Sequence, residues 1–240
     1  MTIEITREVA AKVLSVVDAG LVKGVGVAIP GQMCVEAAVC YAFGLPHGDA
    51  PQCVSPALRT FKIKLNDANW SSEKARANGL RRLALVQLGS AGHLDEKEFA
   101  RRIVDLAIRK AVPSALRIAA SVHKDPTHQA ALMAAAERCE KEGTRQAAND
   151  AKKNASAASA AYAAATASAA DAYADAYAYA ASAYAASAAA SAASAASTSA
   201  AASAAASVYD QELVFFAEQV VQILVKMRVP GVQWLTLAPL

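Results

Sequence analysis

Residues Asn154 to Ser207 read NASAASAAYAAATASAADAYADAYAYAASAYAASAAASAASAASTSAAASAAAS. About three in five of them are alanine, most of the others are serine, and neither glycine nor proline interrupts the run. Alanine is the strongest intrinsic helix former because its side chain loses no rotamer freedom on folding. We therefore expect this segment to be helical. One unbroken helix would extend roughly 80 Å at the standard rise per residue, so a helical hairpin is the alternative.

The alanine-rich segment has two different sides if it is helical. Tyr162, Tyr173 and Tyr184 recur every eleven residues, which is close to three helical turns, and the opposite side is almost pure alanine. Small side chains let helix backbones pack closely, so we expect this face to dock on the core, on itself, on a second copy or on a partner protein. The segment also resembles the alanine-rich helical antifreeze proteins, which implies ice binding. A third reading is disorder, if nothing packs against it.

Upstream of the alanine-rich segment, caps and breakers divide the chain into short helices. Capping side chains, prolines at first helical positions and closing glycines mark the ends of these helices. The stretch from Thr60 to Leu65 is also compatible with a strand, and Pro113 is expected to kink or restart its helix. The expected helices run from Thr6 to Asp18, from about Gln32 to Phe43, from Ser55-Pro56 to Asn66, from Ser72 to Leu88, from the capping box Asp95–Glu98 onward, and from Asp125-Pro126 to Gly143.

The C-terminal part returns to ordinary protein composition. An apolar helix is expected from about Asp210 to Arg228, and the apolar residues of Val208 to Leu240 require a covering surface. The sequence therefore predicts an all-α protein with three parts. These are a multi-helix globular domain at 1–150, an Ala/Ser/Tyr-rich helix or helical hairpin at 151–207, and a C-terminal helix and tail at 208–240 that packs back on the core.

Charge and composition exclude several classes of protein. The net charge of the 240 residues is only +3, and the basic residues are mixed with acids, so no nucleic-acid partner is predicted. The longest non-polar runs are weakly hydrophobic and contain Asp171 and Asp175, so no membrane span is predicted. The N-terminus lacks a signal-peptide pattern, and the four cysteines form no tight framework. We expect a cytoplasmic protein with free thiols.

The residues that could most readily carry out catalysis lie in the stretch Pro30–Cys53, PGQMCVEAAVCYAFGLPHGDAPQC. Cys34 falls in the expected first turn of a helix, where the dipole and free amides lower a thiol pKa. This stretch resembles the nucleophile helix of papain-like and transglutaminase-like enzymes. The resemblance implies Cys34 as a nucleophile and Gln32 as an oxyanion donor. His47 and Asp49 could supply a base and its orienting acid if their loop folds back to Cys34.

Other uses of the same region involve metal or ligand binding. Cys34, Cys40, His47 and Cys53 lack the close Cys-x-x-Cys pair that anchors zinc sites, so we predict neither a metal nor a cofactor. Glu36 is expected to be partly buried and to pair with Arg59, Arg81 or Arg82. Together with Glu36, the polar loop residues Asn66, Asn69 and Trp70 are candidate ligand contacts, although helix capping also explains loop residues of this type.

Two long strings, GQMCVEAAVCYAFGLPHGD at 31–49 and NWSSEKARANGLRRLALVQLGS at 69–90, are similar to a group of bacterial and phage-borne proteins with an alanine-rich segment and a Pro-Gly…Trp-Leu ending. The resemblance implies a bacterial or phage origin and brings no activity. Two functional hypotheses therefore stand. The first is a non-enzymatic helical interaction or assembly protein. The alternative is a Cys-dependent enzyme or a small-ligand-binding domain centred on Cys34, His47 and Asp49.

Overall fold

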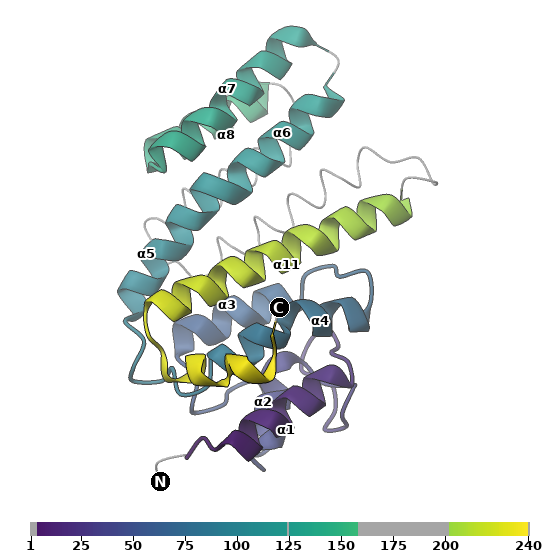
Figure 1. The fold of residues 1–240 in the computed structure, drawn as a ribbon. Coiled ribbons are helices and arrows are strands. Elements are labelled where there is room, and N and C mark those ends of the chain that lie inside the picture. The colour runs from purple at the N-terminus through teal and green to yellow at the C-terminus, as the bar shows by residue number, and fades with distance from the viewer. Residues whose placement is uncertain (1–3, 124, 158–201, 240) are drawn as a thin grey trace. The chain divides into compact units, whose positions relative to one another are not determined.

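The computed structural model describes residues 4–123, 125–157 and 202–239 (Figure 1). Over these residues the regular structure is helical, and β pairing is limited to one isolated bridge between Gly26 and Met33. The predicted all-α fold class is confirmed. Residues 158–201 contain most of the alanine-rich segment. The expected helix or hairpin, its tyrosine spacing and the ice-binding reading therefore lie outside the described residues.

The chain divides into two compact units. Unit 1 combines Met1–Phe99 with Leu213–Leu240, and unit 2 comprises Ala100–Glu212. The C-terminal residues thus belong to the same unit as the first 99 residues. Composition alone placed a boundary at residue 150, whereas packing divides the chain after Phe99.

Unit 1 is built from short helices whose ends follow local capping chemistry. Thr6 Oγ1 accepts a hydrogen bond from Val9 N, and Ser72 Oγ accepts one from Ala75 N, as the sequence predicts. The stretch from Thr60 to Leu65 is helical and not a strand. The elements are α1 (Arg7–Asp18), α2 (Val35–Ala42), α3 (Pro56–Asn66), α4 (Glu73–Val86), the part of α11 (Ala202–Lys226) that follows Glu212, and the 3-10 helix η2 (Pro230–Leu237).

One predicted helix start and one predicted capping bond are wrong, although α3 begins at Pro56 as predicted. The second helix begins at Val35 and not near Gln32, because residues 22–33 form a hydrogen-bonded hairpin. Ser55 does not cap α3 with its hydroxyl, which instead donates to Glu96 Oε1 at 2.6 Å. At Ser55 a partner 41 residues away takes the hydroxyl from the predicted cap.

The C-terminal segment packs on α1, α3 and α4 of unit 1. Phe61 of α3 contacts Phe216 of α11 with ring centroids 6.2 Å apart. Arg82 of α4 donates both to Glu218 Oε2 (3.0 Å) and to the carbonyl of Ala238 (2.8 Å). Leu213, Phe216 and Val220 of the C-terminal helix are buried, whereas Val214 and Phe215 stay exposed. The C-terminal helix therefore packs on unit 1 with one of its sides.

Unit 2 contains the longer helical stretch that begins with α5 (Glu96–Leu106), a helix that starts in unit 1. One π-helical turn, η1 (Ala107–Ala111), joins α5 to α6 (Val112–Val122), and Pro113 lies in the first turn of α6. α7 (Pro126–Glu142) and α8 (Arg145–Ala157) follow, and the first part of α11, residues 202–212, also belongs to unit 2. The guanidinium of Arg109 donates to the carbonyls of Glu140, Lys141 and Glu142, which closes the C-terminal end of α7.

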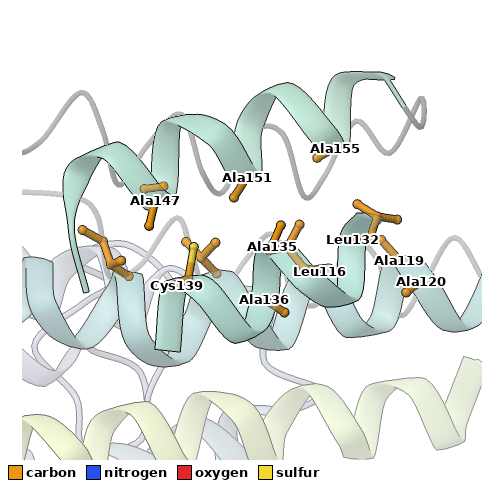
Figure 2. Close-up of a cluster of buried hydrophobic side chains, with 13 residues drawn as sticks. Leu116, Ala119, Ala120, Leu132, Ala135, Ala136, Cys139, Ala147, Ala151 and Ala155 are labelled. Atoms are coloured by element: carbon orange, nitrogen blue, oxygen red, sulfur yellow. The ribbon is translucent and has the colours of Figure 1, made fainter. Parts of the chain in front are cut away.

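The core of unit 2 is made largely of alanine (Figure 2). Ala147, Ala151 and Ala155 lie on one side of α8 and are buried against α6 and α7, where Leu116 and Leu132 supply larger side chains. Alanine at every fourth position forms one face of a helix and permits close helix packing. Among the described residues, no helix combines the length and apolar character needed to cross a membrane.

Candidate functional site

A hydrogen-bonded hairpin, residues 22–33, leads into α2. Val22 N donates to Met33 O at 3.1 Å, and Val27 N donates to Gln32 O at 2.8 Å. Gly26 lies in the left-handed region at φ 71°, and a Cβ there would come within 2.1 Å of the Gln32 carbonyl oxygen. Only glycine fits this position. The hairpin therefore sets where the start of α2 lies.

Cys34 is the N-cap of α2 and precedes its first helical residue. Its Sγ accepts a hydrogen bond from Ala37 N at 3.3 Å, and the residue is buried. Burial raises the pKa of the Cys34 thiol above its ordinary value, against the smaller effect of the two helix amides. The expectation of a lowered thiol pKa is therefore wrong, because desolvation exceeds the stabilisation from the helix end.

His47 and Gln32 are exposed and lie outside the cavity described below. The Nε2 of His47 is 3.0 Å from the carbonyl oxygen of Gly26. Because a carbonyl only accepts, Nε2 carries the proton in this contact. Within the described part of the chain, no hydrogen bond joins the His47 imidazole to the Cys34 thiol.

A small cavity opens at the start of α2. Its volume is about 80 Å³, which is room for several water molecules. It brings together four residues that the sequence singled out and leaves out His47, Gln32, Asn69 and Trp70. The cavity is lined by Cys34, Glu36, Asp49 and Asn66, together with Gly24, Val25, Val35, Ile63 and Asp67.

Glu36 forms a buried ion pair below the cavity. Its Oε1 lies 3.2 Å from Nζ of Lys62, and both side chains are 0% exposed. Desolvation raises the pKa of Glu36 and lowers the pKa of Lys62, in each case against the attraction of the other charge. Of the predicted partners, Arg81 pairs with Asp18 and Arg82 with Glu218, whereas the charge of Arg59 acts on Glu36 and lowers its pKa.

Only one oxygen of the Glu36 carboxylate has a close donor group, because Oε1 faces the Lys62 ammonium and Oε2 has no hydrogen-bond partner. Lys62 Nζ lies 3.2 Å from Oε1, so the ammonium is the partner of this oxygen. A buried carboxylate oxygen without a donor, here Oε2, is costly, because it has lost water and gained no replacement. Glu36 is thus a buried acceptor with unused capacity that lines an open cavity.

Asn66 and Asp67 hold the hairpin against α3. The Asn66 side chain accepts from Val35 N (3.2 Å) and donates to Val22 O (2.9 Å). Asp67 Oδ1 accepts from Gly24 N at 2.8 Å. Trp70, another expected ligand contact, is buried and donates from its indole nitrogen to Leu65 O at 2.9 Å. Asn66 and Trp70 therefore have structural hydrogen bonds.

The cavity lining favours a positively charged group. It carries the carboxylates of Glu36, Asp49 and Asp67 and no basic side chain. The start of a helix ordinarily attracts anions through its free amides. Here Val35 N donates to Asn66 and Ala37 N donates to Cys34, so these amides are occupied.

Lys62 and the hairpin were missed from the sequence. Lys62 lies four residues after Leu58 and three before Leu65, both buried, and so occupies a core position of α3. A lysine among the buried apolar positions of a helix predicts that an acidic side chain is buried beside it. The local sequence does not predict that the hairpin lies beside α3, because the bond from Gly24 N to Asp67 joins residues 43 positions apart.

Among the described residues, no cluster of three or more histidine, cysteine or acidic side chains has an arrangement that could hold a metal ion. Comparisons of the chain with protein-family models, with curated proteins and with solved structures found no match. A function for the candidate site is therefore argued from the geometry of the site alone.

Proposed function

We propose that this protein is a non-catalytic binding protein whose cavity at the start of α2 receives a primary ammonium group. The observation that carries the proposal is the Glu36 carboxylate, which is fully buried, lines the cavity and has no hydrogen-bond donor on Oε2. An ammonium group has three N–H donors and a positive charge. It would supply the missing donor to Oε2 and balance the charges of Asp49 and Asp67, which line the same cavity.

The neighbouring carboxylates support the same choice of ligand. Asp49 is half-buried and lines the cavity together with Glu36. Its charge raises the pKa of Glu36, so the two carboxylates interact unfavourably without a ligand. A cation bound between them would relieve this repulsion.

The chemistry around Cys34 supports binding over catalysis. A nucleophilic cysteine needs a lowered thiol pKa or an adjacent base. Burial raises the pKa of Cys34, and the imidazole of His47 is hydrogen-bonded to the Gly26 carbonyl. Cys34 is better explained as a buried helix cap that forms one wall of the cavity.

Titration of the full-length protein with n-butylammonium chloride tests the proposal. We expect weak binding, of about millimolar affinity, because the probe has few atoms. Amide signals of Val35, Glu36 and Ile63 in ¹H–¹⁵N NMR spectra should shift with saturation. Neutral n-butanol and tetramethylammonium chloride, which lacks N–H donors, should leave these signals unchanged at equal concentration. No shift with n-butylammonium, or equal shifts with n-butanol, would exclude an ammonium site.

Two variants distinguish binding of n-butylammonium at the cavity from attraction by the overall charge of the protein. Asp49→Asn should weaken n-butylammonium binding several-fold, because it removes a lining charge and leaves the Glu36–Lys62 pair intact. Glu73→Gln is the matched control, since it removes the same charge from an exposed position at the start of α4. Equal affinity in the two variants would show that only the overall charge matters.

A second proposal is association through the alanine-rich face with a second copy or a partner protein. It is favoured by the α8 packing, in which Ala147, Ala151 and Ala155 are almost fully buried against neighbouring helices. Light scattering of the intact chain and of a chain lacking residues 158–201 tests this proposal, which requires a smaller assembly for the shortened chain. The four free, buried thiols support a reducing location such as the cytoplasm.

A further inference from the structure

The hairpin beside the cavity exposes aliphatic side chains. Val25, Val27 and Ile29 are 37%, 49% and 52% exposed, and they make up half of the large exposed hydrophobic residues in the described part of the chain. They lie at every second position of one short segment. Such clustering is unusual for an unbound surface, because isolated exposed hydrophobic residues are the normal pattern.

These side chains cannot withdraw easily from water, because the hairpin backbone is held on several sides. Gly24 N donates to Asp67, the Gly26 carbonyl accepts from His47, and Cys34 N donates to Val25 O. The aliphatic surface is therefore a fixed feature. We call Val25, Val27 and Ile29 the hairpin surface.

The hairpin surface is continuous with the cavity. Val25 belongs to both, and Gly24 beside it also lines the cavity. Val27 and Ile29 lie beyond the lining, where a short amine bound inside the cavity leaves them uncovered. The two features together therefore fit a ligand with one amine and adjoining aliphatic groups.

We propose that the ligand is a segment of a partner polypeptide in which a lysine side chain enters the cavity and neighbouring aliphatic residues pack on the hairpin surface. This inference rests on the proposed function, because it requires the ammonium site at Glu36. The cavity volume of about 80 Å³ suits the five heavy atoms of a lysine side chain, at roughly 10–15 Å³ for each water-sized position. A polypeptide carries both chemical groups at the required separation, since adjacent residues lie within a few ångströms.

Short capped peptides test the inference with the full-length protein. The probes are Ac-Leu-Lys-Leu-NH₂, Ac-Gly-Lys-Gly-NH₂, Ac-Leu-norleucine-Leu-NH₂ and n-butylammonium chloride, all measured by NMR titration. We expect the leucine-flanked lysine peptide to bind roughly tenfold more tightly than the glycine-flanked one, because burial of one aliphatic side chain contributes that much. The norleucine peptide, which lacks the ammonium group, should bind far more weakly than either.

Substitutions on the hairpin surface test whether the preference for the leucine-flanked peptide depends on Val27 and Ile29. Val27→Ser with Ile29→Ser should abolish the tenfold preference and leave n-butylammonium binding unchanged, since neither residue lines the cavity. Met133→Gln is the matched control, because Met133 is an exposed hydrophobic residue of unit 2, and it should change nothing.

The outcomes distinguish the inference from the function on which it rests. If n-butylammonium binds but both lysine peptides bind equally, or if the serine variant keeps the preference, the partner inference is wrong and the ammonium site stands. If no amine binds, both are wrong. Self-association of the intact chain that the serine substitutions abolish would assign the hairpin surface to a second copy and would also overturn the inference.

Discussion

At the scale of single residues, the candidate site depends on the buried pair of Glu36 and Lys62. Each side chain is fully buried, and each pKa is displaced toward the neutral form. Such a pair often contributes little net stability compared with apolar residues of the same size. Under the proposed function, the role of this pair beside the cavity is to present Glu36 Oε2, which has no hydrogen-bond partner, to a bound ammonium group.

The thiols give the first prediction. Burial raises the pKa of Cys34, and it raises the pKa of Cys40 and of Cys139 to about 11. With a pKa near 11, about one thiol in a thousand is ionised at pH 8. Iodoacetamide should therefore leave the native protein almost unmodified in mass spectra, whereas the urea-unfolded chain should gain four adducts. Rapid modification of native Cys34 near neutral pH would restore the nucleophile hypothesis.

The second prediction concerns Lys62→Met. The substitution leaves Glu36 buried without its counter-charge and should cost about 3–5 kcal/mol of unfolding free energy at neutral pH. The pKa of Glu36, already raised, should rise further, so the folded state holds its proton more strongly than the unfolded state. Stability of this variant should be greatest below the ordinary Glu pKa of 4.5 and fall as pH rises through the raised value.

Urea unfolding at several pH values checks this prediction. The double variant Glu36→Gln with Lys62→Met removes both charges, and it should recover most of the loss and the altered pH dependence. A single variant as stable at neutral pH as the double variant would show that Glu36 is not ionised in the native protein.

The sequence predicted part of this site. Cys34, Glu36 and Asp49 are close in sequence, and a helix start at that point brings them together. Lys62 and Asp67 come from α3, and their proximity depends on packing between α2 and α3 that no local pattern encodes.

At the scale of elements, capping chemistry predicted the helices where the cap bond is local. Thr6, Ser72 and Asp125 each accept an amide within three residues, and these starts were predicted correctly. α3 also begins where it was predicted, at Pro56, but the Ser55 hydroxyl donates to Glu96, 41 residues away, and does not cap the helix. The Ser-Pro signal therefore located the helix end, whereas the partner of the serine hydroxyl could not be predicted from local sequence.

The hairpin gives the element-scale prediction, which compares Gly26→Ala with Gly24→Ala. Both glycines have positive φ, but a Cβ at Gly26 would lie 2.1 Å from a backbone oxygen, whereas one at Gly24 meets nothing within 4 Å. Gly24→Ala should cost about 1–2 kcal/mol from backbone strain alone. Gly26→Ala should cost more and should open the hairpin, which hydrogen exchange of the Val22 and Val27 amides would report. Equal losses of stability and equal hydrogen exchange in the two variants would contradict the conclusion that the Gln32 carbonyl oxygen leaves no room for a Cβ at residue 26.

At the scale of the whole molecule, composition and packing mark different divisions. Composition changes after residue 150, but the described helices divide after Phe99, and the C-terminal residues belong with the first 99. The core of unit 2 is already rich in alanine upstream of residue 150, as in Ala135 and Ala136 of α7. Composition therefore does not report where helices stop packing on one core and start on another.

The return of the C-terminus to unit 1 gives the last prediction, which compares Gly231→Ala with Gly48→Ala. Gly231 of η2 is buried against the end of α4, where a Cβ would lie 2.3 Å from the Val86 carbonyl oxygen, and Gly48 has no neighbour within 4 Å. Overpacking of this kind costs about 1–3 kcal/mol, so Gly231→Ala should lower the unfolding free energy of unit 1, and Gly48→Ala should not. Hydrogen exchange with peptide-level mass spectrometry should show faster exchange in α1 and α4 and unchanged exchange in α6 to α8. Equal acceleration in both units would mean that they unfold as one cooperative body, because a lesion confined to η2 would then be felt throughout the chain.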